Sequence, residues 1–175
     1  MKQISKKKVI KIIVAGEGGV GKTTLLHRYI DRKFYKDTSM TVGLEFFLID
    51  HIVDEENYVL QVWDLGGQER FQFLHDKFSS GSRGALLLFD LTSNRSFERI
   101  DGWINILEVY NQKVPILLVG CKLDLIDEIA VDDDRILGRR KRYGFIDFIK
   151  TSAKTGENVE NIFDRLVSKI LKIQD

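Results

Sequence analysis

Short apolar runs separated by longer mixed segments set the pattern of this chain. The runs ALLLF at 85–89 and ILLV at 116–119 contain no polar residue at all. A strand without polar alternation is typical of the centre of a parallel sheet, where helices cover both faces. Six strand-like runs are predicted, at residues 8–15, 42–53, 58–63, 84–91, 114–120 and 144–150.

The spacing of these runs predicts the fold class. A short polar turn, DEEN at 54–57, separates the second run from the third, which is typical of an antiparallel hairpin. Most other runs are separated by helical lengths, which implies parallel strands with right-handed crossovers. We therefore predict one domain over residues 1–175, a three-layer α/β fold. Its six-stranded sheet is mostly parallel with one antiparallel strand, and helices cover both faces.

Two segments in the second half of the chain have helical signals. Between residues 159 and 171, apolar residues recur at helical spacing and form one stripe, which we interpret as core packing. The acidic run 132–134 is typical of a helix N-terminus, where the helix dipole favours negative charge. The basic run 139–142 then falls at the other end, where the dipole and solvation account for it. A membrane-surface or acidic-partner role is the alternative for this run.

Composition narrows the class of protein. The formal net charge is +1, which argues against a nucleic-acid-binding protein. The sequence has no run of about 18 apolar residues, so no membrane-spanning helix is expected. A single cysteine, Cys121, excludes an intramolecular disulfide and fits a reducing cytosol. We expect a cytoplasmic monomer.

Residues 16–23, GEGGVGKT, fit the phosphate-binding P-loop pattern G-x-x-x-x-G-K-[ST]. A strand-like run precedes them and a helical pattern comes after them, which is the setting that the motif requires. Glycines without a Cβ let successive N–H groups point at an anion, and the helix N-terminus adds partial positive charge. Lys22 would reach the β- and γ-phosphates, and the Thr23 hydroxyl would bind Mg²⁺. The alternative, a glycine-rich turn before an ordinary helix, fits this combination poorly.

A second motif follows the third strand-like run. In WDLGGQE at 63–69, Asp64 could hold a magnesium ion through a water, and Gly67 could offer its N–H to the γ-phosphate. Gln68 could orient an attacking water. Together with the P-loop, these residues predict that the protein hydrolyses the nucleotide it binds.

Two further segments point to the base of the nucleotide. In GCKLD at 120–124, Asp124 could accept hydrogen bonds from guanine N1–H and the exocyclic amine, which adenine cannot supply. A backbone N–H within TSAK, at 151–154, could meet guanine O6. The pattern therefore favours GTP over ATP.

These motifs carry a resemblance that covers nearly the full chain. The strings TVGLEF at 41–46, WDLGGQERF at 63–71 and TSAKTGENV at 151–159 resemble those of Ras-superfamily small GTPases, nearest the Rab-like branch. The resemblance implies the P-loop NTPase G domain as the fold. It also implies a slow, Mg²⁺-dependent hydrolysis of GTP to GDP, and a molecular switch for intracellular trafficking or signalling.

The resemblance assigns roles to matching positions. The implied catalytic residues are Gln68, Lys22, Gly67 and Thr41. The implied nucleotide-binding residues are Gly18, Gly19, Val20, Gly21, Lys22, Thr23, Thr24, Phe34, Thr41, Gly67, Cys121, Lys122, Asp124, Ser152, Ala153 and Lys154. The implied metal ligands are Thr23, Thr41 in the GTP state alone, and Asp64 through a water. Among these, Phe34 would pack against the base.

Two segments should change with the bound nucleotide, roughly residues 33–43 and 65–78. Exchange factors, GTPase-activating proteins and effectors are expected to bind through residues 33–46 and 63–78. Three aromatics match the effector-binding triad of Rab-like proteins, and three further residues add apolar surface: Phe46, Trp63 and Phe78, then Phe71, Phe73 and Leu74. Packing against the sheet is the alternative for these side chains.

Three features depart from the family pattern. Cys121 stands where the family usually has Asn, which helps to tie the base loop to the P-loop, so we expect faster nucleotide exchange. Gly66 precedes Gly67 where many Ras and Rab members have Ala, and the extra glycine should ease loop movement. The last residues, KIQD at 172–175, hold no cysteine for prenylation. A peripheral membrane location is therefore expected only with a lipidated tail beyond this sequence.

Two other functions compete with the switch GTPase. A GTP-binding scaffold with negligible hydrolysis is opposed by Gly18 and Gln68, which match the hydrolysis-competent pattern, while Cys121 leaves room for it. An ATP-using enzyme is opposed by Asp124 and the TSAK segment. The sequence shows no obvious internal arginine finger: Arg70 and Arg83 qualify by charge alone, and a solvated surface role fits each better.

Overall fold

The computed structural model describes residues 7–36, 39–67, 80–110 and 114–172. They form one six-stranded sheet in the order β2-β3-β1-β4-β5-β6. The strands are β1 (Lys8–Ala15), β2 (Leu44–Val53), β3 (Glu56–Leu65), β4 (Gly84–Asp90), β5 (Ile116–Cys121) and β6 (Asp147–Lys150). The β2–β3 pair is antiparallel and the other neighbouring pairs are parallel, so the predicted sheet is confirmed.

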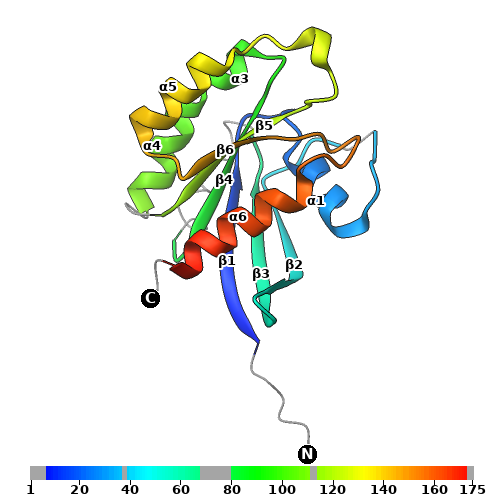
Figure 1. Cartoon of the computed structure of the whole chain (residues 1–175), viewed down its shortest axis with the longest axis vertical. Coiled ribbons are helices and arrows are strands. Elements are labelled where there is room, and N and C mark those ends of the chain that lie inside the picture. The colour runs from blue at the N-terminus through cyan, green and yellow to red at the C-terminus, as the bar shows by residue number, and fades with distance from the viewer. Residues whose placement is uncertain (1–6, 37–38, 68–79, 111–113, 173–175) are drawn as a thin grey trace, which may run out of the picture.

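Helices lie on both faces of this sheet, as predicted. They are α1 (Lys22–Asp31), α3 (Asn94–Glu98), α4 (Ile100–Tyr110), α5 (Asp133–Tyr143) and α6 (Val159–Lys172), with a short 3-10 helix η2 (Ile126–Glu128). Helices α1 and α6 cover one face, and α3, α4 and α5 form a separate group on the other (Figure 1). Within the described ranges, no helix combines the length and apolar character needed to cross a membrane.

Alternating side chains of the central strands divide the core into two layers. In β4, Leu86 and Leu88 pack in the layer of α1 and α6, while Leu87 and Phe89 pack in the layer of α3, α4 and α5. Every residue of β4 is buried, which is why its sequence shows no polar alternation. The apolar stripe of α6 packs in the first layer, in agreement with its interpretation as core.

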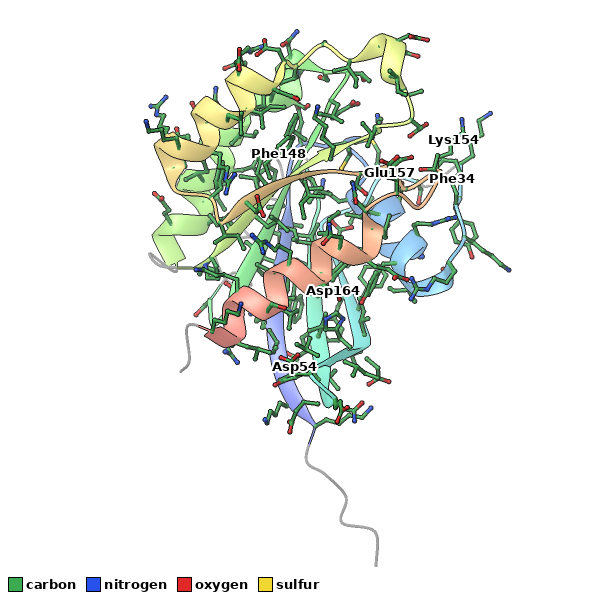
Figure 2. All side chains as sticks on the ribbon, in the orientation of Figure 1. Phe34, Asp54, Phe148, Lys154, Glu157 and Asp164 are labelled. Carbon is green, nitrogen blue, oxygen red and sulfur yellow. The ribbon has the colours of Figure 1, made fainter. Side chains whose placement is uncertain are left out.

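The element ends differ from the sequence prediction at several points. Strand β2 begins at Leu44 and β5 at Ile116, each two residues later than predicted, and β6 is confined to Asp147–Lys150. Strand β3 is longer than predicted by two residues at each end, and at its start the reason is a tighter hairpin turn. Asp54 and Glu55 alone form it, at φ of 50° and 65°, which is the backbone that a two-residue hairpin turn requires. Figure 2 shows Asp54 at the tip of this hairpin.

The charged runs of α5 are engaged within the fold. Asp132 caps the helix, and its side chain accepts a hydrogen bond of 2.9 Å from the N–H of Arg135. Near the other end, Arg139 forms ion pairs of 2.6 Å with Asp101 and 3.2 Å with Glu98. These contacts join α5 to α3 and α4. They favour the structural interpretation of the basic run over a role as a free basic surface.

Candidate nucleotide site

The motifs predicted from the sequence meet at one edge of the sheet. The P-loop, 16–23, joins β1 to α1, and residues 64–67 comprise the end of β3 and the glycine pair directly after it. Strand β5 ends at the first residue of 121–124, the other three come directly after it, and residues 151–154 follow β6. Because these strands are parallel to one another, their carboxyl ends lie on the same side, where α/β folds bind ligands.

The P-loop backbone takes a path that side chains would block. Gly16, Gly19 and Gly21 have φ of 145°, 80° and 107°, a region that glycine adopts without strain. A Cβ on Gly16 would lie 2.3 Å from the carbonyl oxygen of Leu88. Gly21 is the N-cap of α1 and offers no capping side chain, so the first N–H groups of the helix can bind an anion instead.

Lys22 is buried in the P-loop. Its Nζ donates hydrogen bonds to the carbonyl oxygens of Gly16, at 2.9 Å, and Glu17, at 3.0 Å. Burial lowers the pKa of the Lys22 ammonium, while the nearby Asp64 carboxylate acts in the opposite direction. Neutral carbonyls therefore hold the ammonium at a pocket whose lining also includes residues 18, 19, 21, 23, 24, 39–41 and 67. A charged acceptor in this pocket would form a stronger hydrogen bond with it.

Three oxygen-bearing side chains cluster next to Lys22. The Thr23 hydroxyl lies 2.6 Å from the Thr41 hydroxyl and donates a hydrogen bond of 2.5 Å to Asp64 Oδ2. The other oxygen, Asp64 Oδ1, is buried and has no hydrogen-bond partner within the described ranges. Burial raises the pKa of the Asp64 carboxyl. Hard oxygen ligands around a buried, incompletely satisfied carboxylate fit Mg²⁺, which commonly retains waters in such sites.

The glycines after Asp64 make close backbone contacts with two other segments. The Gly66 N–H donates a hydrogen bond of 2.9 Å to the Gly43 carbonyl. A Cβ on Gly66 would lie 2.7 Å from that oxygen and 2.9 Å from the Thr41 carbonyl oxygen. A Cβ on Gly67 would lie 2.1 Å from the backbone nitrogen of Gly18. Glycine at both positions thus allows residues 41–43 and the P-loop to touch the end of β3.

A wider pocket of about 530 Å³ opens beside the phosphate end. Its lining includes Phe34, Cys121, Lys122, Asp124, Thr151, Ala153 and Lys154, together with Gly19–Gly21. Ser152 Oγ donates a hydrogen bond of 2.6 Å to Asp124 Oδ1, which orients this carboxylate. Figure 2 shows Phe34 and Lys154 next to each other at this corner of the molecule. The size and the mixed lining suit a purine nucleoside.

Cys121 lies at the inner wall of this pocket, packed in the core layer that contains Val20 and Leu25. Burial raises the pKa of its thiol to about 12. The thiol is therefore uncharged at neutral pH and behaves as a small apolar group. The next residue, Lys122, has a positive φ of 66° and forms an ion pair of 2.6 Å with Asp90 Oδ2.

Two functional positions escaped the sequence analysis. Asp90 ends β4 and fixes Lys122, and its position as an acid after a buried strand was the available signal. Glu17 is the first variable residue of the P-loop motif, and its carboxylate pairs with Arg95, at 3.2 Å, and with Arg99. The motif leaves position 17 open, so nothing in the pattern marked Glu17.

Several predicted residues lie elsewhere or outside the described ranges. Gln68, Arg70, Phe78 and the apolar residues Phe71, Phe73 and Leu74 fall within 68–79, which the structure does not describe. Phe46 and Trp63 lie together with ring centroids 4.6 Å apart, and Phe46 is exposed. Arg83 lies directly before β4, at the end of the strands opposite to the site. Its backbone N–H donates a hydrogen bond to the Lys11 carbonyl, and this position is consistent with a surface role.

Comparison with known proteins finds relatives over most of the chain. The family model described as Ras family matches residues 11–172. The chain is 35% identical to the Ypt/Rab-type GTPase ypt7 of Schizosaccharomyces pombe, over 97% of this chain and 86% of that protein. It is 38% identical to the Ras-related protein Rab-27B of Rattus norvegicus, over 94% of this chain and 80% of that protein. The Ras-related protein Rab-18 of Lymnaea stagnalis is 35% identical, over 93% and 81%.

Proposed function

The chain belongs to the Ras family and is a Rab-like small GTPase, and from this we propose how its own residues bind and cleave GTP. The protein acts as a molecular switch that hydrolyses GTP to GDP and phosphate. The observation that carries the residue assignment is the cluster of Thr23, Thr41 and Asp64 oxygens beside the buried Lys22 ammonium. We further propose that the switch serves intracellular trafficking and acts as a cytoplasmic monomer.

The P-loop binds the phosphates. The backbone N–H groups of residues 18–23 donate to phosphate oxygens, because their glycines leave these groups open to an anion. Lys22 exchanges the Gly16 and Glu17 carbonyls for the β- and γ-phosphates, whose charged oxygens accept a stronger hydrogen bond.

The hydroxyls of Thr23 and Thr41 would hold Mg²⁺ directly, and Asp64 would hold it through a water. The bound ion would supply positive charge beside the phosphates, which favours hydrolysis. Burial raises the pKa of Asp64, and Lys22 and the Thr23 hydroxyl oppose this rise by stabilising the charged carboxylate. Thr41 would join this site in the GTP state alone, so it would link the metal to the nucleotide that is bound.

The pocket beside the phosphate end holds guanine. Asp124, oriented by Ser152, accepts hydrogen bonds from the N1–H and the exocyclic amine. The Lys122 stem lies along the base and is fixed from behind by Asp90. A backbone N–H of residues 152–154 meets guanine O6, and Phe34 covers the open side. Adenine lacks the two donors that Asp124 requires and is rejected.

Hydrolysis requires little more than positioning and electrostatic stabilisation. Gln68 orients the attacking water, and Gly67 donates its N–H to the γ-phosphate. Loss of that phosphate removes the contacts of Thr41 and Gly67, so the segments 33–43 and 65–78 are released together. Exchange factors, activating proteins and effectors read this change through residues 33–46 and 63–78, where the exposed Phe46 beside Trp63 offers an apolar contact.

Single-turnover hydrolysis of GTP by the purified protein with Mg²⁺ tests the proposal. We expect a rate of the order of 10⁻⁴ s⁻¹, lost in Gln68→Leu and absent with ATP. Binding of GTP without cleavage would support the competing GTP-binding scaffold, which lacks a specific observation in its favour. Binding of ATP as tight as that of GTP would refute the assignment of Asp124.

A further inference from the structure

Glu17 connects the P-loop to helix α3. Its carboxylate oxygen Oε1 lies 3.2 Å from Arg95 Nε and 3.8 Å from Arg99 Nε, and its side chain is only 18% exposed. Arg95 lies in the first turn of α3, and Arg99 is the residue that caps its C-terminal end. Two guanidinium groups therefore face one carboxylate, and this cluster has a net charge of +1.

The same residue contacts the two groups that handle the phosphates. The Glu17 carbonyl accepts a hydrogen bond from Lys22 Nζ at 3.0 Å. A Cβ on Gly67 would lie 2.5 Å from the Glu17 carbonyl carbon, so this peptide is also in close contact with the residue that meets the γ-phosphate. The carboxylate that Arg95 and Arg99 face therefore belongs to a residue in direct contact with both groups, within the range over which charges act on phosphates bound there.

An uncompensated carboxylate at this position would repel the phosphates of the nucleotide. We propose that Arg95 and Arg99 are positioning residues of the nucleotide site: they offset the charge of Glu17, and so slow the release of GDP and GTP. This inference rests on the proposed function, because it concerns retention of the same nucleotide.

The two arginines are more exposed than Arg139, which pairs with acids in the same region. Their side chains are 79% and 50% exposed, whereas the Arg139 side chain, paired with Glu98 and Asp101, is 13% exposed. Exposed ion pairs are weak and are screened by salt. The effect is therefore expected to be modest and largest at low ionic strength.

Release of a fluorescent GDP analogue from the Mg²⁺-loaded protein measures this effect. We expect Arg95→Ala/Arg99→Ala to release it about three- to tenfold faster than the unmodified protein in low salt. The difference should shrink in high salt. Arg135→Ala is the matched control, because it removes an arginine that pairs with Glu98 at 2.6 Å on the same side of the fold. Its release rate should equal that of the unmodified protein.

Glu17→Gln separates charge from mechanical tethering. If the arginines act by offsetting charge, Glu17→Gln alone retains GDP at least as well as the unmodified protein. Added to the double arginine variant, it restores slow release to within about twofold. Arg95→Lys/Arg99→Lys, which keeps both charges, should likewise retain GDP.

Two outcomes overturn the inference while the proposed function stands. One is a double arginine variant that releases GDP as slowly as Arg135→Ala. The other is Glu17→Gln alone releasing GDP as fast as the double arginine variant, which would make the contact a simple tether. An unmodified protein that retains no guanine nucleotide would instead overturn the proposed function, and this inference with it.

Discussion

The two ends of the nucleotide site are built in different ways. At the phosphate end, backbone touches backbone: a Cβ on Gly67 would lie 2.1 Å from the Gly18 nitrogen, and Asp64 is fully buried. At the base end, side chains make the contacts around a pocket of about 530 Å³, as in the bond from Ser152 to Asp124. Few residue types other than glycine fit the close backbone contacts at the phosphate end, while the base end accommodates a change such as Cys121.

This difference reflects what each end must recognise. Phosphates are recognised by charge and by converging N–H groups, which a fixed backbone supplies. Guanine is distinguished from adenine by a few hydrogen bonds, which individual side chains supply. Substitutions at the phosphate end should therefore damage chemistry through steric conflict, whereas substitutions at the base end should change affinity and specificity step by step.

The largest effect is expected at the base end, where one carboxylate makes two bonds to guanine. Asp124→Ala should weaken GDP binding about 10³-fold, since each charge-assisted hydrogen bond contributes about 1.5–3 kcal/mol. Equilibrium binding of GDP measures the loss. Asp127→Ala, an exposed acid in η2, is the matched control and should bind GDP normally. Equal binding by both variants would show that Asp124 does not select the base.

At the phosphate end, Gly67→Ala should separate chemistry from binding. The added Cβ cannot share space with the Gly18 nitrogen, so the contact between the second switch segment and the P-loop opens. Single-turnover GTP hydrolysis should fall about 10²-fold, while GDP binding changes little. Gly102→Ala, where a Cβ meets no atom within 4 Å, should leave both unchanged. Normal hydrolysis by Gly67→Ala would refute this account of the close contact.

Cys121→Asn restores the family residue at the base end and should slow the release of GDP. One regained hydrogen bond of about 1 kcal/mol corresponds to about fivefold. Stopped-flow release of a fluorescent GDP analogue measures this, with Cys121→Ser as a control that removes the thiol without adding an amide. Release by Cys121→Asn that is no slower than that of the unmodified protein would contradict the idea that Cys121 speeds exchange.

Gly66→Ala should have an effect of about the same size as Cys121→Asn. Its Cβ would lie 2.7 Å from the Gly43 carbonyl oxygen and 2.9 Å from the Thr41 carbonyl oxygen, so the backbone of residues 41–43 must move, at a cost of about 1 kcal/mol. Because Thr41 is a proposed metal ligand, the Mg²⁺ concentration needed to retain GTP should rise about fivefold. An unchanged Mg²⁺ requirement would show that residues 41–43 move away from the added Cβ without cost.

The sequence predicted the sheet and the motifs at the phosphate end well, for a physical reason. Apolar runs such as 85–89 and the spacing of GEGGVGKT are local patterns, and parallel strands then bring the motifs to one edge. Residues 54–57 were likewise recognised as a turn. The sequence did not predict that the turn has only two residues. Such a turn requires positive φ at Asp54 and Glu55, and these residue types do not indicate that backbone conformation.

Contacts between distant segments could not be read from the sequence. The pairing of Glu17 with Arg95 and the fixing of Lys122 by Asp90 join elements far apart in the chain, and their register depends on the packed fold. The close approach of Gly66 to Gly43 is similar: the sequence showed an extra glycine, and the structure showed the carbonyl that requires it. The role of Gln68 stays a prediction, because it lies outside the described residues.

The position of the single cysteine gives the protein a built-in chemical reporter of its own opening. Only 4% of Cys121 is exposed, and burial raises the pKa of its thiol to about 12. Alkylating reagents and mild oxidants react with an accessible thiolate, so they should spare Cys121 in the folded protein whether or not a nucleotide fills the pocket. Covalent labelling then requires local opening of the core layer around Cys121. Its rate would count opened molecules in a mixture without any attached dye.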